Sequence, residues 1–308
     1  MRSASSGRRR PNVGWQAYAG LLLLLASVGG AVLLGRSGED AFGGAVLAYA
    51  SDSGGHRAIW LSDARRSTEL RAGGCGGSGS YSPAWSRDGR RLAFLTMRAG
   101  QHAVCVVESA NDEGRIVFET GSKVSNVVWH PSGRQLLLAR TADDGSGAVV
   151  EVSASGRRNE IVLTTGPQGF GRPAWQPDGG GFVVATAENH LQFYDRRGAL
   201  TDTWAGTTDQ SPAWSRDGSR LAFVREQPGG WALLVLDVRT NRLATVASSE
   251  SLLFHPDWSR DDRRLAFEGY DRRSGSADIF LTEVSGKEGN ARVLVGGPGD
   301  DTSPALRP

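Results

Sequence analysis

The feature that most constrains the fold is a phrase of about fifteen residues that the chain repeats five times. Each copy places a tryptophan before a polar turn and an apolar run, as in "SPAWSRDGRRLAFLT" from residue 82 and "SPAWSRDGSRLAFVR" from residue 211. The five tryptophans, 39 to 46 residues apart, are Trp85, Trp129, Trp175, Trp214 and Trp258. Self-similarity with a period in the forties indicates a propeller, in which each repeat forms one blade.

Each repeat divides into four segments with the pattern of antiparallel strands. The tryptophan strand leads into a turn that is usually Asp-Gly, such as Asp88–Gly89, a pair that tolerates positive φ and suits tight hairpins. Three runs rich in β-branched and aromatic residues follow, for instance "RRLAFLT", "HAVCVVE" and "GRIVFET". The sequence therefore predicts an all-β protein with four-stranded antiparallel blades.

The two ends of the repeat region complete one another. The segment "AVLAYASD" at 45–52 matches a second strand with no tryptophan strand before it, whereas "SPALRP" at 303–308 matches a tryptophan strand, with Leu306 replacing tryptophan. We expect 303–308 to complete the first blade and close the ring, because closure removes open sheet edges. Residues 45–308 then give 44 residues for each of six blades, so we predict a six-bladed β-propeller.

The residues before the repeats have the pattern of a membrane segment. No charged residue lies between Pro11 and Gly35, and residues 17–34 are apolar or small throughout. As a helix these residues would rise about 27 Å, close to the hydrocarbon thickness of a bilayer. We predict a single transmembrane signal anchor at 15–35, joined to the propeller by a linker at 36–44. A cleaved signal peptide over the same residues is the alternative.

The arginines near the start of the chain indicate the orientation of that segment. A basic stretch at 1–14 precedes the apolar residues, and positive charge stays on the cytoplasmic side of a membrane. The N-terminus is therefore expected inside and the propeller outside the cytoplasm, tethered to the cytoplasmic membrane, or periplasmic or secreted if the segment is cleaved. The formal net charge is +2, and this stretch contributes +4 of it. Since the rest of the chain carries no basic excess, we expect no nucleic-acid partner.

The chain has two cysteines, Cys75 and Cys105, which excludes a multi-cysteine metal site. Outside the cytoplasm a disulfide between them is permitted. The predicted fold places Cys75 in a glycine-rich loop between blades and Cys105 in a third strand of the adjoining blade. A disulfide is therefore one of two open alternatives.

Candidate binding residues follow from the direction of the strands. The Asp-Gly turns belong to one face of the ring, and the loops between blades belong to the other. On that second face a polar residue stands three positions before each tryptophan or its equivalent: Ser82, Asn126, Arg172, Ser211, His255 and Ser303. They are expected to ring the channel mouth, flanked by Tyr81, Gln210, Phe254 and Thr302. One interpretation is a funnel for an anionic or hydrogen-bonding guest, and the other is a solvated rim.

Two further features are expected on the same face. Trp231 follows "QPGG" in a turn, and an aromatic side chain in an exposed turn is a frequent interface anchor. His56, His102 and His190 hold equivalent positions in three blades. These blades stand too far apart around the rim for bonds of about 2.1 Å to one zinc ion. We therefore expect solvated histidines, with no metal site and no cofactor.

The phrase around each tryptophan resembles the TolB-like, WD-like propeller repeat, whose usual form is Pro-x-Trp-Ser-Pro-Asp-Gly before an apolar strand. The resemblance covers residues 45–308 and implies the six-bladed fold. Departures from the usual form are Arg87, Arg216 and Arg260 for proline, Ser132 for aspartate and Asp262 for glycine. TolB itself carries an α/β domain before its propeller, whereas about forty residues precede the repeats here. The expectation is a relative of TolB and not TolB itself.

The resemblance implies docking of partner proteins on the funnel face. Our leading hypothesis is a membrane-tethered propeller that binds a protein or peptide in the bacterial cell envelope as a scaffold or sensor. The alternative is a small molecule or glycan bound in the channel. A lactonase-like hydrolase is a lesser alternative, because calcium requires converging oxygen ligands and the predicted ring holds no carboxylate. The sequence also contains no Gly-x-Ser-x-Gly motif, so we expect no enzymatic activity.

Overall fold

The computed structural model describes residues 40–308, apart from positions 64, 158–159, 206–207, 272–274, 286–287 and 290. The predicted basic stretch, the anchor at 15–35 and the start of the linker lie outside the described residues. Within the described part of the chain, no helix has the length and apolar character needed to cross a bilayer.

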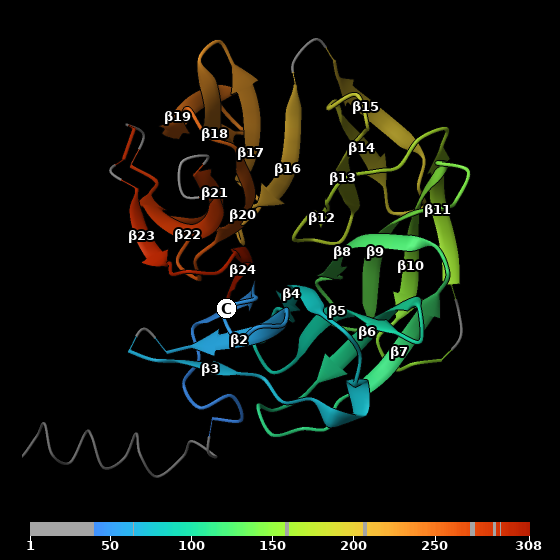
Figure 1. The fold of residues 1–308 in the computed structure, drawn as a ribbon. Helices are drawn as coiled ribbons and strands as arrows, with labels where there is room; N and C mark the ends of the chain where they lie inside the picture. The colour runs from blue at the N-terminus through green and yellow to red at the C-terminus, as the bar shows by residue number, and fades with distance from the viewer. Residues whose placement is uncertain are drawn as a thin grey trace, which may run out of the picture. The chain divides into compact units, whose positions relative to one another are not determined.

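The described residues form 24 strands in six four-stranded antiparallel sheets, with a single 3-10 turn, η1, at Gly73–Cys75. The sheets are arranged as blades around a common centre (Figure 1). The first blade consists of β24 (Asp301–Leu306), β1 (Leu47–Ser51), β2 (Ala58–Ser62) and β3 (Ser67–Glu69). The six blades and their antiparallel pairing confirm the predicted architecture.

In the other five blades the strands follow chain order from the channel outward. The second blade consists of β4 (Ser80–Trp85), β5 (Leu92–Arg98), β6 (Gln101–Val107) and β7 (Arg115–Thr120). The third consists of β8 (Lys123–Trp129), β9 (Gln135–Thr141), β10 (Gly147–Ser153) and β11 (Glu160–Gly166). The fourth consists of β12 (Pro173–Trp175), β13 (Gly181–Ala185), β14 (Leu191–Asp195) and β15 (Leu200–Trp204).

The fifth blade consists of β16 (Asp209–Trp214), β17 (Arg220–Gln227), β18 (Gly230–Asp237) and β19 (Arg242–Ser249). The sixth consists of β20 (Leu253–Trp258), β21 (Arg264–Asp271), β22 (Ser276–Glu283) and β23 (Arg292–Val295). Strand β24 then returns to the first blade and pairs with β1, with Leu306 opposite Leu47 and Ala305 opposite Ala48. This pairing confirms that the ring is closed by the end of the chain, although the strand begins at Asp301 rather than at residue 303.

The repeated tryptophans pack between blades, as predicted. At three junctions the indole nitrogen donates a hydrogen bond of 2.9–3.2 Å to a backbone carbonyl of the preceding blade. The three pairs are Trp85 with Ala305, Trp129 with Ala84, and Trp258 with Ala213. Because a buried indole N–H needs an acceptor, this bond fixes both the ring and the spacing of adjacent blades.

An arginine of the preceding blade covers each of these three tryptophans. Its guanidinium carbon lies 4.6–5.1 Å from the indole centroid, and the same group donates to a turn carbonyl of the tryptophan's own blade. We call this arrangement the arginine clamp: Arg307 with Trp85 and Gly89, Arg91 with Trp129 and Gly133, and Arg220 with Trp258 and Asp262. A cation over an aromatic face contributes about 0.5–2 kcal/mol.

Four of the innermost strands contain a bulge at the same repeat position. The pairing register shifts there, and the residue three before the tryptophan position adopts a φ of 48–53°. These residues are Ser82, Ser211, His255 and Ser303. Each precedes a proline, which lacks an N–H and is tolerated because the strand is the inner edge of its sheet. Bulges redirect side chains, so they determine how these polar residues face the channel mouth.

Candidate functional site

The antiparallel order of the blades sorts the loops onto two faces. We call the face with the Asp-Gly turns, such as Asp88–Gly89, the turn face. The opposite face, with the loops between blades and the hairpins joining second to third strands, is the funnel face. The central channel runs between the two faces, and its wall is the innermost strand of each blade.

The channel encloses a cavity of about 180 Å³. Its wall is mainly the apolar ends of the innermost strands, including Ala84, Ala174, Ala213 and Ala305. Four charged residues also line it: Arg87, Arg172, Arg216 and Asp257. An apolar wall with a small number of convergent charged groups is the usual composition of a ligand site.

Arg172 and Asp257 bring opposite charges into this channel. A guanidinium nitrogen of Arg172 donates to the carbonyl of Pro256 at 3.4 Å, and a carboxylate oxygen of Asp257 accepts from the backbone nitrogen of Leu306 at 2.7 Å. Burial raises the pKa of Asp257 and lowers the pKa of Arg172, and in each case the charge of the other residue opposes the effect of burial. The predicted ring residue Arg172 therefore faces an acidic partner that the ring itself did not contain.

His255 belongs to a second polar group, which joins the sixth blade to the first. Its Nδ1 lies 3.0 Å from a carboxylate oxygen of Glu268, and the same oxygen accepts from the backbone nitrogen of Ser303 at 3.0 Å. Burial would raise the pKa of Glu268, but the hydrogen bond and charge of His255 outweigh it and lower that pKa. His255 and Ser303 are thus brought together through a buried carboxylate.

A third group joins the second and third blades. The hydroxyl of Ser82 donates to the side-chain oxygen of Asn126 at 3.3 Å, and both residues are buried. The hydroxyl of Tyr81 lies 2.6 Å from Nδ1 of His102 and donates to the carbonyl of Val124 at 3.0 Å. Burial raises the pKa of Tyr81 to about 12, so the phenol stays protonated and remains a donor.

The remaining predicted ring residues make a less open surface than we expected. Ser211 is 7% exposed, and Gln210, Thr302 and Ser303 are half-buried. Below Gln210, the carboxylate of Asp209 is fully buried and accepts two hydrogen bonds from Arg225, at 2.6 and 2.8 Å. The structure therefore arranges the predicted ring as separate polar groups instead of one continuous rim.

Trp231 differs from its expected setting. It is the second residue of β18 and not part of an exposed turn, and it is half-buried. Its ring centroid lies 6.2 Å from that of Phe254, which lies 6.0 Å from that of His255. We call Trp231, Phe254 and His255 the aromatic row. The row crosses from the fifth blade to the sixth on the funnel face and ends at Glu268.

Sequence reasoning missed Asp257, Glu268 and Asp209. Asp257 stands directly before a tryptophan, where four other repeats and the closing strand carry alanine or valine. Glu268 occupies the position held by Leu95 and Val224 in related repeats. A charged residue at an otherwise apolar repeat position was the available signal for both. Among the described residues, however, no three His, Cys, Asp or Glu side chains are placed to hold a metal ion.

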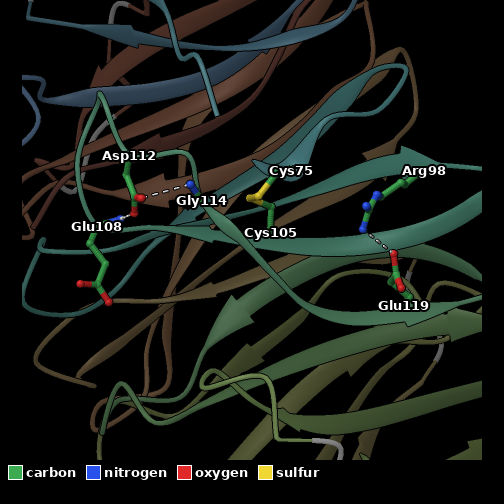
Figure 2. The surroundings of a disulfide bond; sticks show 7 residues. All are labelled: Cys75, Arg98, Cys105, Glu108, Asp112, Gly114 and Glu119. Carbon is green, nitrogen blue, oxygen red and sulfur yellow. Dashed lines mark hydrogen bonds and ion pairs between the residues drawn. A yellow bond between two sulfur atoms is a disulfide. The ribbon is translucent and has the colours of Figure 1, made fainter. Parts of the chain in front are cut away.

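The two cysteines form a disulfide, with their Cα atoms 5.8 Å apart (Figure 2). Cys75 ends η1 and Cys105 lies within β6. The loop of Cys75 does not stay on the funnel face as expected, because Gly74 donates to the carbonyl of Glu113 in the loop between β6 and β7. Gly114 has a φ of 74°, and a Cβ there would lie 2.7 Å from the sulfur of Cys75. Asp112 holds this turn by accepting from the backbone nitrogen of Gly114 (Figure 2).

Sequence comparison found curated relatives that match this chain over part of their own length. No protein-family model matches the sequence. The chain is 24% identical over 221 residues to the uncharacterized peptidase YuxL of Bacillus subtilis (strain 168), covering 69% of this chain and 31% of that protein. It is 40% identical over 72 residues to the Tol-Pal system protein TolB of Syntrophus aciditrophicus (strain SB), covering 22% and 16%. The chain thus spans less than a third of these curated relatives.

Solved structures share the architecture at low sequence identity. TolB from Acinetobacter baumannii superposes with a TM-score of 0.71 at 16% identity, covering 90% of this chain and 69% of that one. An oligogalacturonate lyase in complex with manganese superposes with a TM-score of 0.56 at 15% identity, covering 77% and 71%. The described residues therefore have the TolB-like six-bladed propeller fold that the repeat predicted.

Proposed function

We propose that this chain is a membrane-tethered, extracytoplasmic propeller whose funnel face binds a protein or peptide of the bacterial cell envelope. The observation that carries the proposal is the aromatic row, where half-buried Trp231, Phe254 and His255 lie beside the buried carboxylate of Glu268. Aromatic side chains are enriched among the residues that dominate protein interfaces.

The fold and the disulfide support this assignment. Solved TolB structures share the fold, and one relative is named as a Tol-Pal system protein. Disulfides persist outside the cytoplasm and are rare within it, so the bond between Cys75 and Cys105 favours an extracytoplasmic propeller. It closes a separation of 30 residues, for which loop-closure entropy gives about 3–4 kcal/mol.

The described chain enters the propeller at the turn face. Ala110, in a loop of the turn face, donates to the carbonyl of Ala41 at 2.8 Å, and Phe42 packs edge-on against Trp85 at 4.7 Å. The funnel face lies at the opposite end of the channel from these residues.

The test is photo-crosslinking in living cells from two positions of the aromatic row. A crosslinkable amino acid replaces Phe254 in one strain and Trp231 in another, and adducts are identified by mass spectrometry. We expect the same protein adduct from both positions. A strain with the crosslinker at Asp88, an exposed residue of the turn face, is the matched control.

The same experiment separates docking from chance proximity. Substituting His255→Ala next to the Phe254 crosslinker removes the hydrogen-bond partner of Glu268 while leaving the probe in place. A true docking site then loses at least half of its adduct. Equal adducts from Asp88, or no protein adduct from the aromatic row, would contradict a protein partner.

A second candidate function is small-molecule or glycan binding in the channel, favoured by Arg172 and Asp257 inside an apolar wall. Its test is thermal denaturation of the purified chain with acidic and neutral oligosaccharides. A stabilising ligand whose effect disappears in Arg172→Ala, but persists in Trp231→Ala, supports this candidate. For both candidate functions we propose binding without catalysis. Release of product from a peptide or lactone substrate would overturn the proposal that the chain is not an enzyme.

A further inference from the structure

Three arginines replace proline in the repeat, and the proposed role of the funnel face does not explain them. They stand two residues after a tryptophan: Arg87, Arg216 and Arg260. The equivalent residues elsewhere are Pro131, Pro177 and Pro308. Arg87 and Arg216 line the turn-face end of the channel together with these three prolines, whereas Arg260 lies outside the lining.

Arg87 spans the end of the channel from the second blade. One guanidinium nitrogen donates to the carbonyl of Pro177 in the fourth blade at 2.7 Å, and another donates to the carbonyl of Arg216 in the fifth at 3.3 Å. Both acceptors are backbone groups, so the positive charge of Arg87 is held over the channel without a carboxylate partner in these bonds.

Arg216 has a hydrogen-bond donor without a partner at the turn-face end of the channel. Its Nε is buried and finds no hydrogen-bond acceptor among the described residues. A buried donor without an acceptor is unfavourable, and native structures satisfy nearly all such groups with protein, water or ligand. The unsatisfied Nε therefore indicates a missing acceptor at the turn-face end of the channel.

Charged groups of both signs surround Arg216. Asp257 and Asp262 attract it, whereas Arg87 and Arg260 repel it. The carboxylate of Asp262 accepts from the backbone nitrogens of Arg216 and Asp217, at 2.8 and 3.1 Å, and that of Asp257 accepts from Leu306. The nearby turn acids Asp88 and Asp217 are hydrogen-bonded within their own turns. These carboxylates thus accept from backbone and hydroxyl groups, and none of them accepts from the Nε of Arg216.

We propose that the turn-face end of the channel is a binding site for a small oxyanion, a phosphate or a carboxylate group, held by Arg216 and Arg87. Guanidinium groups bind such oxygens through paired, charge-assisted hydrogen bonds. The cavity of about 180 Å³ is smaller than the roughly 300–1,000 Å³ of pockets for drug-sized ligands, which suits a small anion or a single anionic group. This site is independent of the proposed partner surface, because it lies at the opposite end of the channel.

The test is isothermal titration of the purified full chain with inorganic phosphate and, separately, with acetate, at low ionic strength. We expect binding by the unaltered protein, at least about a tenfold loss of affinity in Arg216→Gln, and a smaller loss in Arg87→Gln. Arg260→Gln is the matched control, since it removes the same charge from the same repeat position outside the cavity. Its affinity is expected to change by about twofold or less.

A conservative variant distinguishes a built site from general positive charge. Arg216→Lys keeps the charge and removes the planar guanidinium, so a built site loses affinity in this variant as well. If Arg216→Gln does not fold, the affinity of Arg216→Lys tests the proposal in its place. Tighter binding of phosphate assigns the site to a phosphoryl group, and tighter binding of acetate assigns it to a carboxylate. Absence of binding to both anions, or an equal loss in Arg260→Gln, would overturn the proposal.

Discussion

Two neighbouring blade junctions show how one repeat position changes the attachment between blades. Between the fifth and sixth blades, the indole of Trp258 donates to Ala213 and lies under Arg220, which also bonds Asp262. Between the fourth and fifth blades, Gly181 stands where Arg220 would be in the repeat, so this position supplies no guanidinium to cover Trp214. The indole nitrogen of Trp214 is buried and finds no acceptor among the described residues.

The junction without a clamp depends on apolar packing instead. Leu191 of the fourth blade packs with Leu221 and Phe223 of the fifth in one buried cluster. A larger residue cannot replace Gly181, because a Cβ there would clash with the carbonyl of Tyr194. The same tryptophan phrase therefore gives a polar, directional junction in one place and an apolar one in the next. The difference lies six residues after the tryptophan.

The largest expected effect is on the tryptophans themselves. Trp258→Ala removes a buried ring, its hydrogen bond and its cation contact, so it should lower the free energy of unfolding by about 3–5 kcal/mol. Trp214→Ala removes a half-buried ring with no such bond and should cost clearly less. Urea denaturation of both variants checks this order, and equal losses would show that the clamp contributes little.

Removal of the clamp arginine is expected to have the next largest effect. Arg220→Ala loses the contact over Trp258 and the bond to Asp262, about 1–2 kcal/mol in total. Arg264 is the matched control, because it occupies the same repeat position while its side chain is 47% exposed beside Asp261. We expect Arg264→Ala to change stability by less than about 0.5 kcal/mol. Similar losses in the two denaturation curves would refute a specific role for the clamp.

The junction of the sixth and first blades is expected to depend on pH. Leu306 replaces tryptophan there, and Glu268 bonds His255 within the sixth blade and Ser303 across the junction. Because the pKa of Glu268 is lowered in the folded state, its contribution is present above its unfolded pKa of about 4.3 and is lost as pH falls through the folded value. Glu268→Gln should therefore cost about 1–2 kcal/mol at pH 7 and progressively less below pH 4.3.

Denaturation curves of both proteins from pH 7 to pH 3 measure that difference. Asp261→Asn reports the pH dependence of a carboxylate that is hydrogen-bonded within its own turn and does not cross the junction, so only the additional pH dependence of Glu268→Gln is assigned to the junction. A constant difference between the unaltered protein and Glu268→Gln over the whole range would contradict a pH-dependent junction.

The smallest expected effect tests the unpartnered indole. Trp214→Phe removes a buried N–H that lacks an acceptor, so the change should be within about 0.5 kcal/mol of neutral. Trp258→Phe removes a bonded N–H and leaves the carbonyl of Ala213 without its donor, and it should cost about 1 kcal/mol or more. Thermal melting of Trp214→Phe and Trp258→Phe compares the two losses of stability. A larger loss in Trp214→Phe would contradict the expectation.

The fold could be predicted because its determinants are local and repeated. The tryptophan phrase, the Asp-Gly turns and the matching half-blades at 45–52 and 303–308 give the number of blades and the closure without any knowledge of side-chain contacts. The candidate site could be predicted only in part. Its members stand at one repeat position, but the partners Glu268 and Asp257 come from other strands and other positions, so the pairing depends on the geometry of the closed ring.

The burial of side chains at the rim of the funnel face also could not be predicted from the local sequence. The "QPGG" turn suggested an exposed Trp231, yet Phe254 of the next blade covers one side of its ring. Likewise, the sequence gives no sign that Ser82 donates to Asn126 of the following blade, which buries both residues. Each case involves a contact between blades, with about half a repeat in sequence between Trp231 and Phe254 and one repeat between Ser82 and Asn126.

The pairing of β24 with β1 has a consequence for the kinetics of folding. The contact between Leu47 and Leu306 spans almost the whole described chain, so ring closure carries a high contact order and is expected to be slow. During synthesis, the strand that completes the first blade emerges after all the other described strands. Until it docks, the inner edge of β1 is unpaired and available to other strands. The waiting time for the last strand therefore sets how long each new molecule is exposed to aggregation.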